Sequence, residues 1–190
     1  DDPDANDDHR NDMKPDAVTF STVIDTYAKN GNENSAARAQ ELLDMMEELG
    51  VQPNVYTYSA TITVLARSTD ADSAEKAATL LAHMKSMSEA GHPELKPNVV
   101  NYNSLLNAYI RSRKPGAAQK AEDILDRMEL SVEEGGDDVQ PDRLSYFLCI
   151  NAWGRSSDRN AAARSEQILE RMEKWALAPY TNAHPHMMEP

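Results

Sequence analysis

The sequence has little glycine, a single cysteine and no long hydrophobic run. Of its 190 residues, seven are glycine and one is cysteine. The lone Cys149 excludes an internal disulfide framework, and its position in an apolar stretch favours a buried structural thiol over a nucleophile or a metal ligand. No apolar segment approaches the roughly 20 residues of a membrane span. Glycine-rich phosphate loops, nucleophile motifs and paired catalytic carboxylates are absent too, so we expect no enzyme, no cofactor and no metal site in this segment.

Positive charge is also scarce, because 19 lysines and arginines face 32 acidic residues and the net charge is -13. Taken as a total, this charge argues against a polyanionic partner such as nucleic acid. The acids are not evenly spread, however. The first thirteen residues hold six aspartates and one arginine without apolar periodicity. We expect 1–13 to be a disordered acidic tail, unlike an Arg-rich transit peptide.

One motif occurs four times and begins a fifth time. The copies are PDAVTFSTVIDTYAK from Pro15, PNVYTYSATITVLAR from Pro53, PNVVNYNSLLNAYIR from Pro97 and PDRLSYFLCINAWGR from Pro141, and a broken copy starts at Pro179. The prolines are 38, 44, 44 and 38 residues apart, within the range of helical-repeat periods. We therefore expect repeats at 14–52, 53–96, 97–140 and 141–178, with 179–190 as the start of a truncated fifth repeat or a tail.

Each copy contains two stretches of apolar residues at helical spacing, separated by a polar turn. The first stretches contain Val23, Ile24, Tyr27; Ile62, Leu65; Leu105, Leu106, Tyr109; and Cys149, Ile150, Trp153. The second stretches contain Ala39, Leu42, Leu43, Met46; Leu80, Leu81, Met84; Ile124, Leu125, Met128; and Ile168, Leu169, Met172. Packing is the expected role of all these residues.

These two stripes predict a helix hairpin as the repeat unit, with each proline opening a helix. The additional residues of the two longer copies, in 85–96 and 129–140, are expected to form loops. Because one hairpin cannot bury both of its stripes, the hairpins should stack. The predicted fold is an all-α solenoid, a right-handed superhelix with a concave and a convex side.

The order Pro, Asn or Asp, three residues, Tyr or Phe, and then Ala, Leu-Leu and Met before the next Pro resembles the pentatricopeptide repeat family over residues 14–181. The runs Val-Thr-Phe-Ser at 18–21 and Tyr-Asn-Ser-Leu-Leu at 102–106 are especially similar. Each copy has about three residues more than the usual unit in its hairpin turn. Tetratricopeptide repeats are less similar, because their Trp and Leu-Gly signature is missing. The resemblance implies single-stranded RNA binding in mitochondria or plastids, with one nucleotide per repeat.

The resemblance also implies site residues. The residue after each aromatic faces the base edge, an earlier residue on the same helical face wedges between bases, and a second base-reading residue follows the next proline. The wedge positions are Val18, Tyr56, Val100 and Leu144. Ser21 with Asn54 and Ser59 with Asn98 imply adenine, and Asn103 with Asp142 implies uracil, which gives an A-A-U-like preference. Phe147 with Tyr180 matches no base-reading pair, so the fourth hairpin either stacks a base or reads none.

The residues after the prolines have a second interpretation. Asp16, Asn54, Asn98 and Asp142 are of the types preferred at helix N-caps, and capping does not exclude base reading.

A basic residue ends the first stretch of every copy. These are Lys29, Arg67, Arg111 and Arg155, and the four first stretches together contain five bases and one acid. Stacked hairpins would align the four into a ladder for a phosphate backbone. A base near a helix C-terminus also stabilises the helix dipole by itself, by about 0.3–1 kcal/mol. Both interpretations stay open at this point.

Three hypotheses for the whole chain follow. The leading one is an RNA-binding solenoid, expected to be a monomer without membrane contact, that acts by occupancy or by recruiting other factors. The second is a protein-binding solenoid that uses an acidic convex face. The third is a fragment too short to bind alone. His184 and His186, near the end, lack the further ligands of a metal site.

Overall fold

The computed structural model describes residues 14–133 and 139–177, which form eight α-helices and one short 3-10 helix. The tail expected at 1–13, the truncated repeat expected from 179, and Tyr180, His184 and His186 lie outside the described residues. The elements are α2 (Ala17–Asn30), α3 (Ser35–Glu48), α4 (Val55–Arg67), α5 (Ser73–Glu89), η1 (Pro93–Leu95), α6 (Val99–Ser112), α7 (Ala117–Glu133), α8 (Arg143–Gly154) and α9 (Ala161–Leu177).

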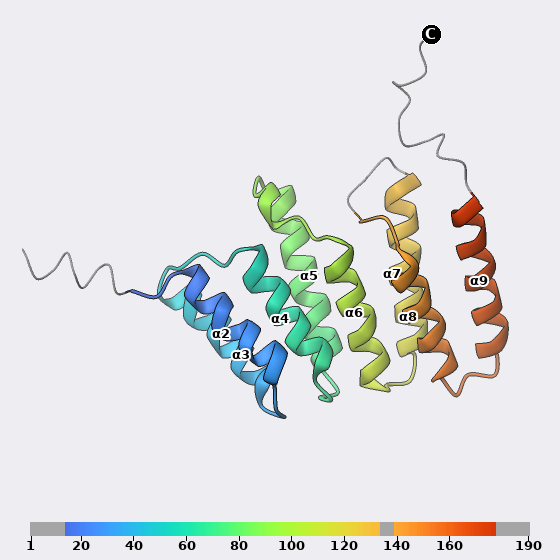
Figure 1. The fold of residues 1–190 in the computed structure, drawn as a ribbon, viewed down its shortest axis with the longest axis horizontal. Helices are drawn as coiled ribbons and strands as arrows, with labels where there is room; N and C mark the ends of the chain where they lie inside the picture. The colour runs from blue at the N-terminus through green and yellow to red at the C-terminus, as the bar shows by residue number, and fades with distance from the viewer. Residues whose placement is uncertain (1–13, 134–138, 178–190) are drawn as a thin grey trace, which may run out of the picture.

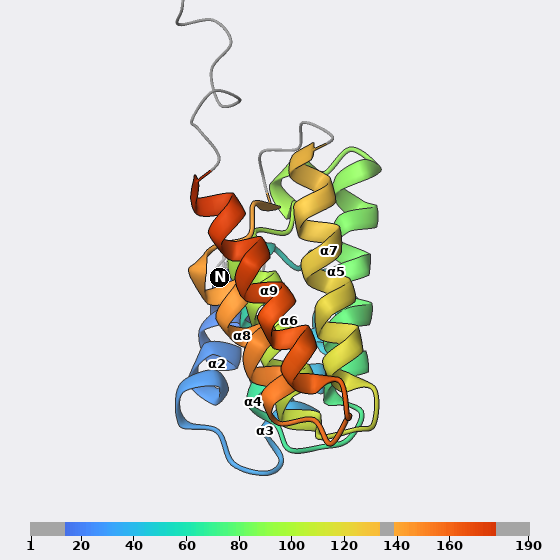
Figure 2. The same ribbon diagram turned by 90° about the vertical axis from the view of Figure 1, so that its right-hand side faces the viewer.

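The helices pair into four hairpins that follow one another along the long axis of the molecule (Figure 1). The first helices α2, α4, α6 and α8 pack side by side in one layer. The second helices form the other layer, where α3, α5 and α7 each contact the first helix of their own hairpin and that of the next. Figure 2 shows α5 and α7 on one side and α2 and α8 on the other. The predicted all-α solenoid of stacked hairpins is confirmed.

The core consists of the predicted apolar stripes. Ile24, Ile62, Leu106 and Cys149 from successive first helices are fully buried. Three second helices each bury an alanine and, seven residues later, a methionine without exposed surface: Ala39 and Met46, Ala77 and Met84, and Ala121 and Met128. The small alanines let neighbouring helices approach closely. Cys149 is a buried structural thiol as predicted, and burial raises its pKa to about 12.

Two stripe residues are exposed, and for these the packing prediction is wrong. Val23 is 42% exposed, although Leu105 and Cys149, its counterparts in the third and fourth hairpins, are buried. Leu169 is 48% exposed, although its counterpart Leu125 is fully buried. The reason is their place in the stack, because no described hairpin lies before α2 or after α9 to cover them.

The four first helices begin in the same way. Each proline lies one residue before the N-cap and not inside the helix, which corrects the expectation that it opens the helix. The next residue has an extended backbone, and its side chain accepts a hydrogen bond from a backbone N–H of the first turn. These N-caps are Asp16, Asn54, Asn98 and Asp142, so the capping interpretation of the four residues is confirmed.

The prediction that the additional residues of the longer copies form loops is wrong in part, because some of these residues are helical. Their first residues are helical, because α5 continues to Glu89 and α7 to Glu133, although α9 of a shorter copy also has 17 residues. Helix-forming residues occupy the extension of α5, where Met87 packs against the core. The chain leaves this helix through Gly91, at a φ of 110°. The short η1 helix then returns the chain to the core through the buried Leu95.

A buried ionic network joins the third and fourth hairpins. Glu122 of α7 is 4% exposed and accepts a hydrogen bond of 2.9 Å from the indole N–H of Trp153. The Arg171 guanidinium of α9 lies 3.4 Å from Glu122 and 2.6 Å from Glu129. Tyr146 donates to Glu129 at 2.8 Å. Burial and this hydrogen bond raise the pKa of Tyr146, so its hydroxyl stays protonated and keeps donating.

Candidate nucleic-acid interface

The surface formed by α2, α4, α6 and α8, which we name the first-helix face, exposes a row of large apolar side chains. The four predicted wedge residues are among the most exposed hydrophobic residues described: Val18 at 65%, Tyr56 at 74%, Val100 at 62% and Leu144 at 48%. They occupy one register position on four neighbouring helices. Apolar groups left outside a core in a continuous row are typical of an interaction surface.

An open groove of about 560 Å³ lies between the first two helices of this face. Its lining includes Val18 and Ser21 of α2, Tyr56 and Ser59 of α4, and the N-cap Asn54. Two predicted wedge residues and three predicted base-reading residues therefore share one cavity, although they lie up to 41 positions apart in the sequence. Its size is within the range of ligand-sized pockets.

The base-reading residues differ in how their polar atoms are used. The Ser21 hydroxyl donates to the Val18 carbonyl of its own helix at 3.1 Å. Ser59 instead accepts a hydrogen bond of 2.8 Å from the side-chain N–H of Asn101, in the next hairpin. Asn103 is 7% exposed and hydrogen-bonded on both sides of its amide. Its Nδ2 donates to Asp142 at 3.1 Å, and its Oδ1 accepts from Ser145 at 2.7 Å.

The predicted pair Asn103 and Asp142 is therefore in direct contact. Partial burial acts to raise the pKa of Asp142, but hydrogen bonds from the Ser145 backbone and from Asn103 outweigh it, and the pKa lies below its usual value. An ionised carboxylate only accepts hydrogen bonds, so it orients the amide of Asn103 with Nδ2 toward itself. One N–H and one lone pair of the Asn103 amide remain available.

The four members of the predicted basic ladder are not equivalent. Lys29 is paired with Asp25 of the same helix at 2.5 Å. Arg67 donates to the carbonyl of Ala28 in the last turn of α2, which satisfies a helix-end carbonyl of the preceding hairpin. Arg111 and Arg155 are exposed, and no hydrogen bond or ion pair with another described residue involves their side chains. The last two are therefore the best placed to meet an external anion.

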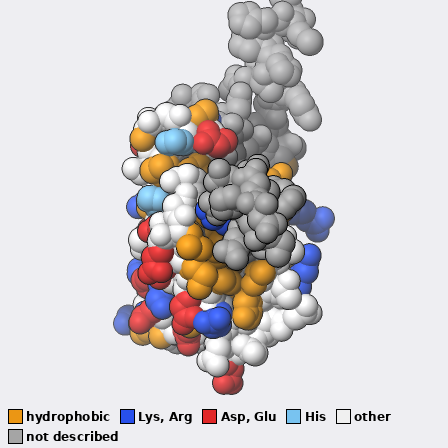
Figure 3. Space-filling view, turned by 90° about the vertical axis from the view of Figure 1, so that its left-hand side faces the viewer, with side chains coloured by type: hydrophobic (Ala, Val, Ile, Leu, Met, Phe, Trp, Pro, Cys, Tyr) orange, Lys and Arg blue, Asp and Glu red, His pale blue; other side chains and the backbone are white. Residues whose placement is uncertain are grey.

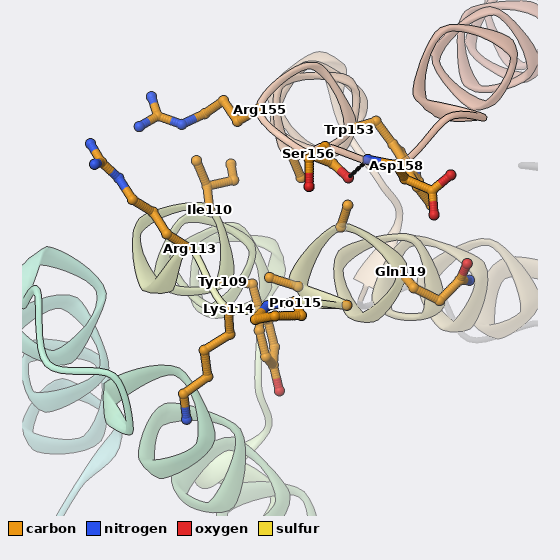
Figure 4. Close-up of a pocket in the computed structure, with 15 residues that line it drawn as sticks. Tyr109, Ile110, Arg113, Lys114, Pro115, Gln119, Trp153, Arg155, Ser156 and Asp158 are labelled. Carbon is orange, nitrogen blue, oxygen red and sulfur yellow. Dashed lines mark hydrogen bonds between the residues drawn. The ribbon is translucent and has the colours of Figure 1, made fainter.

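A cleft of about 690 Å³ between the turns of the third and fourth hairpins adds a base that the sequence analysis missed. Figure 4 shows Arg113 and Arg155 extending to the same side of this cleft, whereas Lys114 points toward α5. There Lys114 pairs with Asp72 at 2.9 Å, and that hydrogen bond raises its pKa. Arg113 has a left-handed backbone with a φ of 51° at the end of α6. The sequence could have indicated Arg113 as a further base of the ladder, because it lies two residues after Arg111.

The fourth hairpin presents an aromatic ring instead of a polar base-reading residue. Phe147 is 58% exposed, whereas Asn103 at the same register is almost buried. Together with Leu144 it forms an apolar end to the first-helix face. Its predicted partner Tyr180 lies outside the described residues.

Charge differs between the two layers. Figure 3 shows acidic and basic side chains intermixed on the side that carries the histidine side chains, and basic ones without acidic neighbours along the opposite edge. Exposed acids on the second helices include Glu41, Asp44, Asp123, Asp126, Glu166 and Glu170. Asp25 is the single carboxylate of the groove between α2 and α4, and Lys29 neutralises it.

The described residues contain neither a metal-binding cluster nor a membrane-spanning helix. Within 14–133 and 139–177, no group of three or more His, Cys, Asp or Glu residues has an arrangement that could hold a metal ion. In the same ranges, no helix combines the length and apolar character needed to cross a membrane.

Comparison with known families identifies the repeats. The PPR repeat family matches residues 15–67, and the pentatricopeptide repeat domain matches residues 85–156. No curated protein matches the chain. Pentatricopeptide repeats are generally RNA-binding helical repeats, and proteins built from them are generally non-enzymatic and typically organellar. With the fold and the recurring motif in agreement with both matches, the chain belongs to the pentatricopeptide repeat family.

Proposed function

We propose that this chain binds single-stranded RNA along its first-helix face, in a mitochondrion or plastid. It would act in RNA processing, stability or translation, by occupying its site or by recruiting other factors. The groove between α2 and α4 carries the proposal, because it combines exposed stacking groups with polar groups at their side. An unpaired base offers a flat apolar face and a hydrogen-bonding edge, and this groove matches both.

Affinity in this scheme comes from stacking and from phosphate contacts. Tyr56 offers an aromatic ring and Val18 an aliphatic wedge to a base inserted between them. Stacking on an aromatic side chain contributes about 1–3 kcal/mol per base. Arg111, in the last turn of α6, and Arg155, just after α8, supply unpaired positive charge. Lys29 and Arg67 contribute less, because each already has a partner.

Specificity comes from the polar residues of the face. Ser21 with Asn54 and Ser59 with Asn98 are the proposed readers of two adenines, and Asn103 with Asp142 the reader of a uracil. A mismatched base leaves a polar group unpaired, which costs about 1–3 kcal/mol. Phe147 of the fourth hairpin would stack on a base of any type, so the expected preference is a short A-A-U-like sequence.

The test is RNA selection by the purified chain, with charge-reversal variants. We expect the variant R67E/R111E/R155E to lose RNA binding. The control K76E/R127E/K174E reverses three exposed bases of the second helices, has the same net charge, and should retain most of the affinity. Equal affinity loss in both variants would show that only total charge matters. The log-log salt slope of the wild type should be about -3, since each of four phosphates contributes about -0.7.

A protein partner is the second candidate, because the second helices present exposed acids. A pull-down compared between wild type and R67E/R111E/R155E distinguishes the two. A partner retained by the variant, together with absent RNA binding by the wild type, would favour the protein-binding solenoid.

A further inference from the structure

We propose that Asn101, at the start of α6, sets the base preference of the preceding hairpin by holding the Ser59 hydroxyl as a hydrogen-bond donor. The inference rests on the proposed RNA-binding function and deepens it, because it assigns a positioning role to a residue that is itself outside the proposed base-reading pairs. It makes the specificity of one hairpin depend on the hairpin that follows.

The orientation of the Asn101 amide follows from its backbone neighbour. The backbone N–H of Asn98 donates to Asn101 Oδ1 at 3.0 Å as part of the capping box of α6. A backbone N–H only donates, so the oxygen of the amide must face it. The Nδ2 group is then directed at Ser59 Oγ, 2.8 Å away. Because Asn101 is 2% exposed, water does not compete with this contact.

This contact determines what Ser59 offers to a base. One lone pair of its oxygen is taken by Asn101, whereas its proton has no partner among the described residues. Ser59 also lines the groove between α2 and α4. The hydroxyl keeps its proton and one of its two lone pairs, so the Asn101 contact favours donation over acceptance. Adenine N1 and cytosine N3 are acceptors on the Watson-Crick edge, and uracil N3 and guanine N1 carry protons. The Ser59 site should therefore favour adenine or cytosine.

The neighbouring Ser21 lacks this support and provides an internal comparison. The residue equivalent to Asn101 is Thr57, which is fully buried and whose hydroxyl exchanges hydrogen bonds only with its own N-cap, Asn54. No side chain donates to the Ser21 oxygen, and its proton is shared with the Val18 carbonyl. Ser21 can rotate between donor and acceptor. Two serines at the same register should thus discriminate bases unequally, Ser59 more strongly than Ser21.

Two substitutions of Asn101 test the proposal. Asn101→Thr reproduces the residue found at Thr57, so the capping box is kept and only the donation to Ser59 is lost. Asn101→Asp replaces the donor by an acceptor, which would take the Ser59 proton and turn the oxygen lone pairs toward the base. Affinities are measured for four RNA oligonucleotides that differ only at the base assigned to Ser59 by selection with the wild type.

We expect the wild type to prefer adenine or cytosine over uracil and guanine by about tenfold. Uracil or guanine would lose the hydrogen bond from Ser59 and would leave the Ser59 hydroxyl unpaired. The preference should fall to about twofold in N101T and reverse in N101D. The converse variant T57N should raise the discrimination between bases at the Ser21 site, because the new Asn side chain would donate to Ser21 as Asn101 donates to Ser59. Thermal unfolding of each variant, followed by circular dichroism, verifies that the fold is retained.

The two ideas fail in different ways. A wild type that binds no RNA overturns both the proposed function and this inference. A wild-type preference that persists unchanged in N101T and N101D overturns the role of Asn101 alone. A reversed preference in N101D with unchanged preference at the Asn103 site supports it, because a general change in charge would affect both sites.

Discussion

At the scale of single residues, the N-caps of the first helices have one observed role and one predicted role. Asn54, Asn98 and Asp142 cap their helices and are also predicted base-reading residues. Capping is required for any such helix, so a cap residue is a fixed point from which a neighbouring group is oriented. Asp142 shows this most directly, because the carboxylate that caps α8 also holds the Asn103 amide.

The double role of Asp142 predicts a double effect of its removal. Asp142→Ala should lower the free energy of unfolding by about 1–2 kcal/mol, because α8 loses its cap and the nearly buried Asn103 loses a hydrogen-bond partner. Asp16→Ala is the control, since the Asp16 side chain caps α2 and bonds only to Thr19 of the same helix. Urea unfolding should show a clearly smaller loss for the control. Equal losses would contradict a contribution from Asn103.

The same carboxylates predict the direction of the pH dependence. The pKa of Asp16 is lowered by hydrogen bonds from Thr19, and that of Asp142 is lowered by hydrogen bonds from Ser145 and Asn103 despite burial. A lowered folded-state pKa adds stability above the unfolded value of about 3.9, and this stability is lost as the pH falls through the folded value. Tm should therefore change little from pH 7 to pH 5 and fall below about pH 4.

In Asp142→Asn, which retains a capping side chain, part of this acid dependence should disappear. A Tm of D142N that falls with acid as steeply as that of the wild type would rule out Asp142 as a contributor.

At the scale of helices, the hairpins are joined by different means along the chain. The first hairpins bury mainly apolar stripes, whereas α7 and α9 meet through carboxylates gathered around Arg171. A buried carboxylate is stable only with a partner, so the guanidinium is required once Glu122 has been placed inside. Burial opposes the charge of Arg171, but hydrogen bonds to Glu129 and Asp126 outweigh it and raise its pKa.

Removal of Arg171 should accordingly be costly. Arg171→Ala removes the guanidinium that pairs with Glu122, Asp126 and Glu129 and leaves Glu122 with Arg164 alone, 3.5 Å away, so the expected loss of unfolding free energy is about 3 kcal/mol. Lys85→Ala, which breaks an exposed pair with Glu89 in α5, should cost well under 1 kcal/mol. Both are measured by urea unfolding. A small loss for R171A would indicate that water replaces the guanidinium.

At the scale of the whole molecule, each hairpin is stabilised by its neighbours, and the ends of the stack differ from its middle. Equivalent residues are buried or exposed according to the number of hairpins that flank them, as Val23 and Leu169 show. The layers also differ in chemistry, since the first-helix face carries the exposed apolar row and the second helices carry exposed acids. The two layers of the solenoid therefore present chemically different surfaces.

Two leucines at the same register test this description. Leu125→Ala should lower the free energy of unfolding by about 3 kcal/mol, because a fully buried side chain leaves a cavity. Leu169→Ala makes the same chemical change at a half-exposed position and should cost less than about 1 kcal/mol. Urea unfolding of the two variants gives the comparison. Similar losses would mean that further residues cover Leu169 in solution.

The sequence by itself determined the repeat register, the helix hairpins, the N-caps and the residues that share the first-helix face. These follow from periodicity and from hydrogen bonds between residues three or four positions apart, which are properties of a short stretch of chain. It also placed Val18, Tyr56, Val100 and Leu144 at one register, and all four are exposed.

Only the tertiary structure decided how neighbouring hairpins act on one another. Asn101 meets Ser59 across 42 positions, and Arg67 meets Ala28 across 39. Neighbouring hairpins also determine two other features, namely the exposure of Val23 and Leu169 and the cleft that Arg113 and Arg155 share. Such contacts depend on the distance and rotation between stacked helices. Several side chains together set that geometry, and no short motif encodes it.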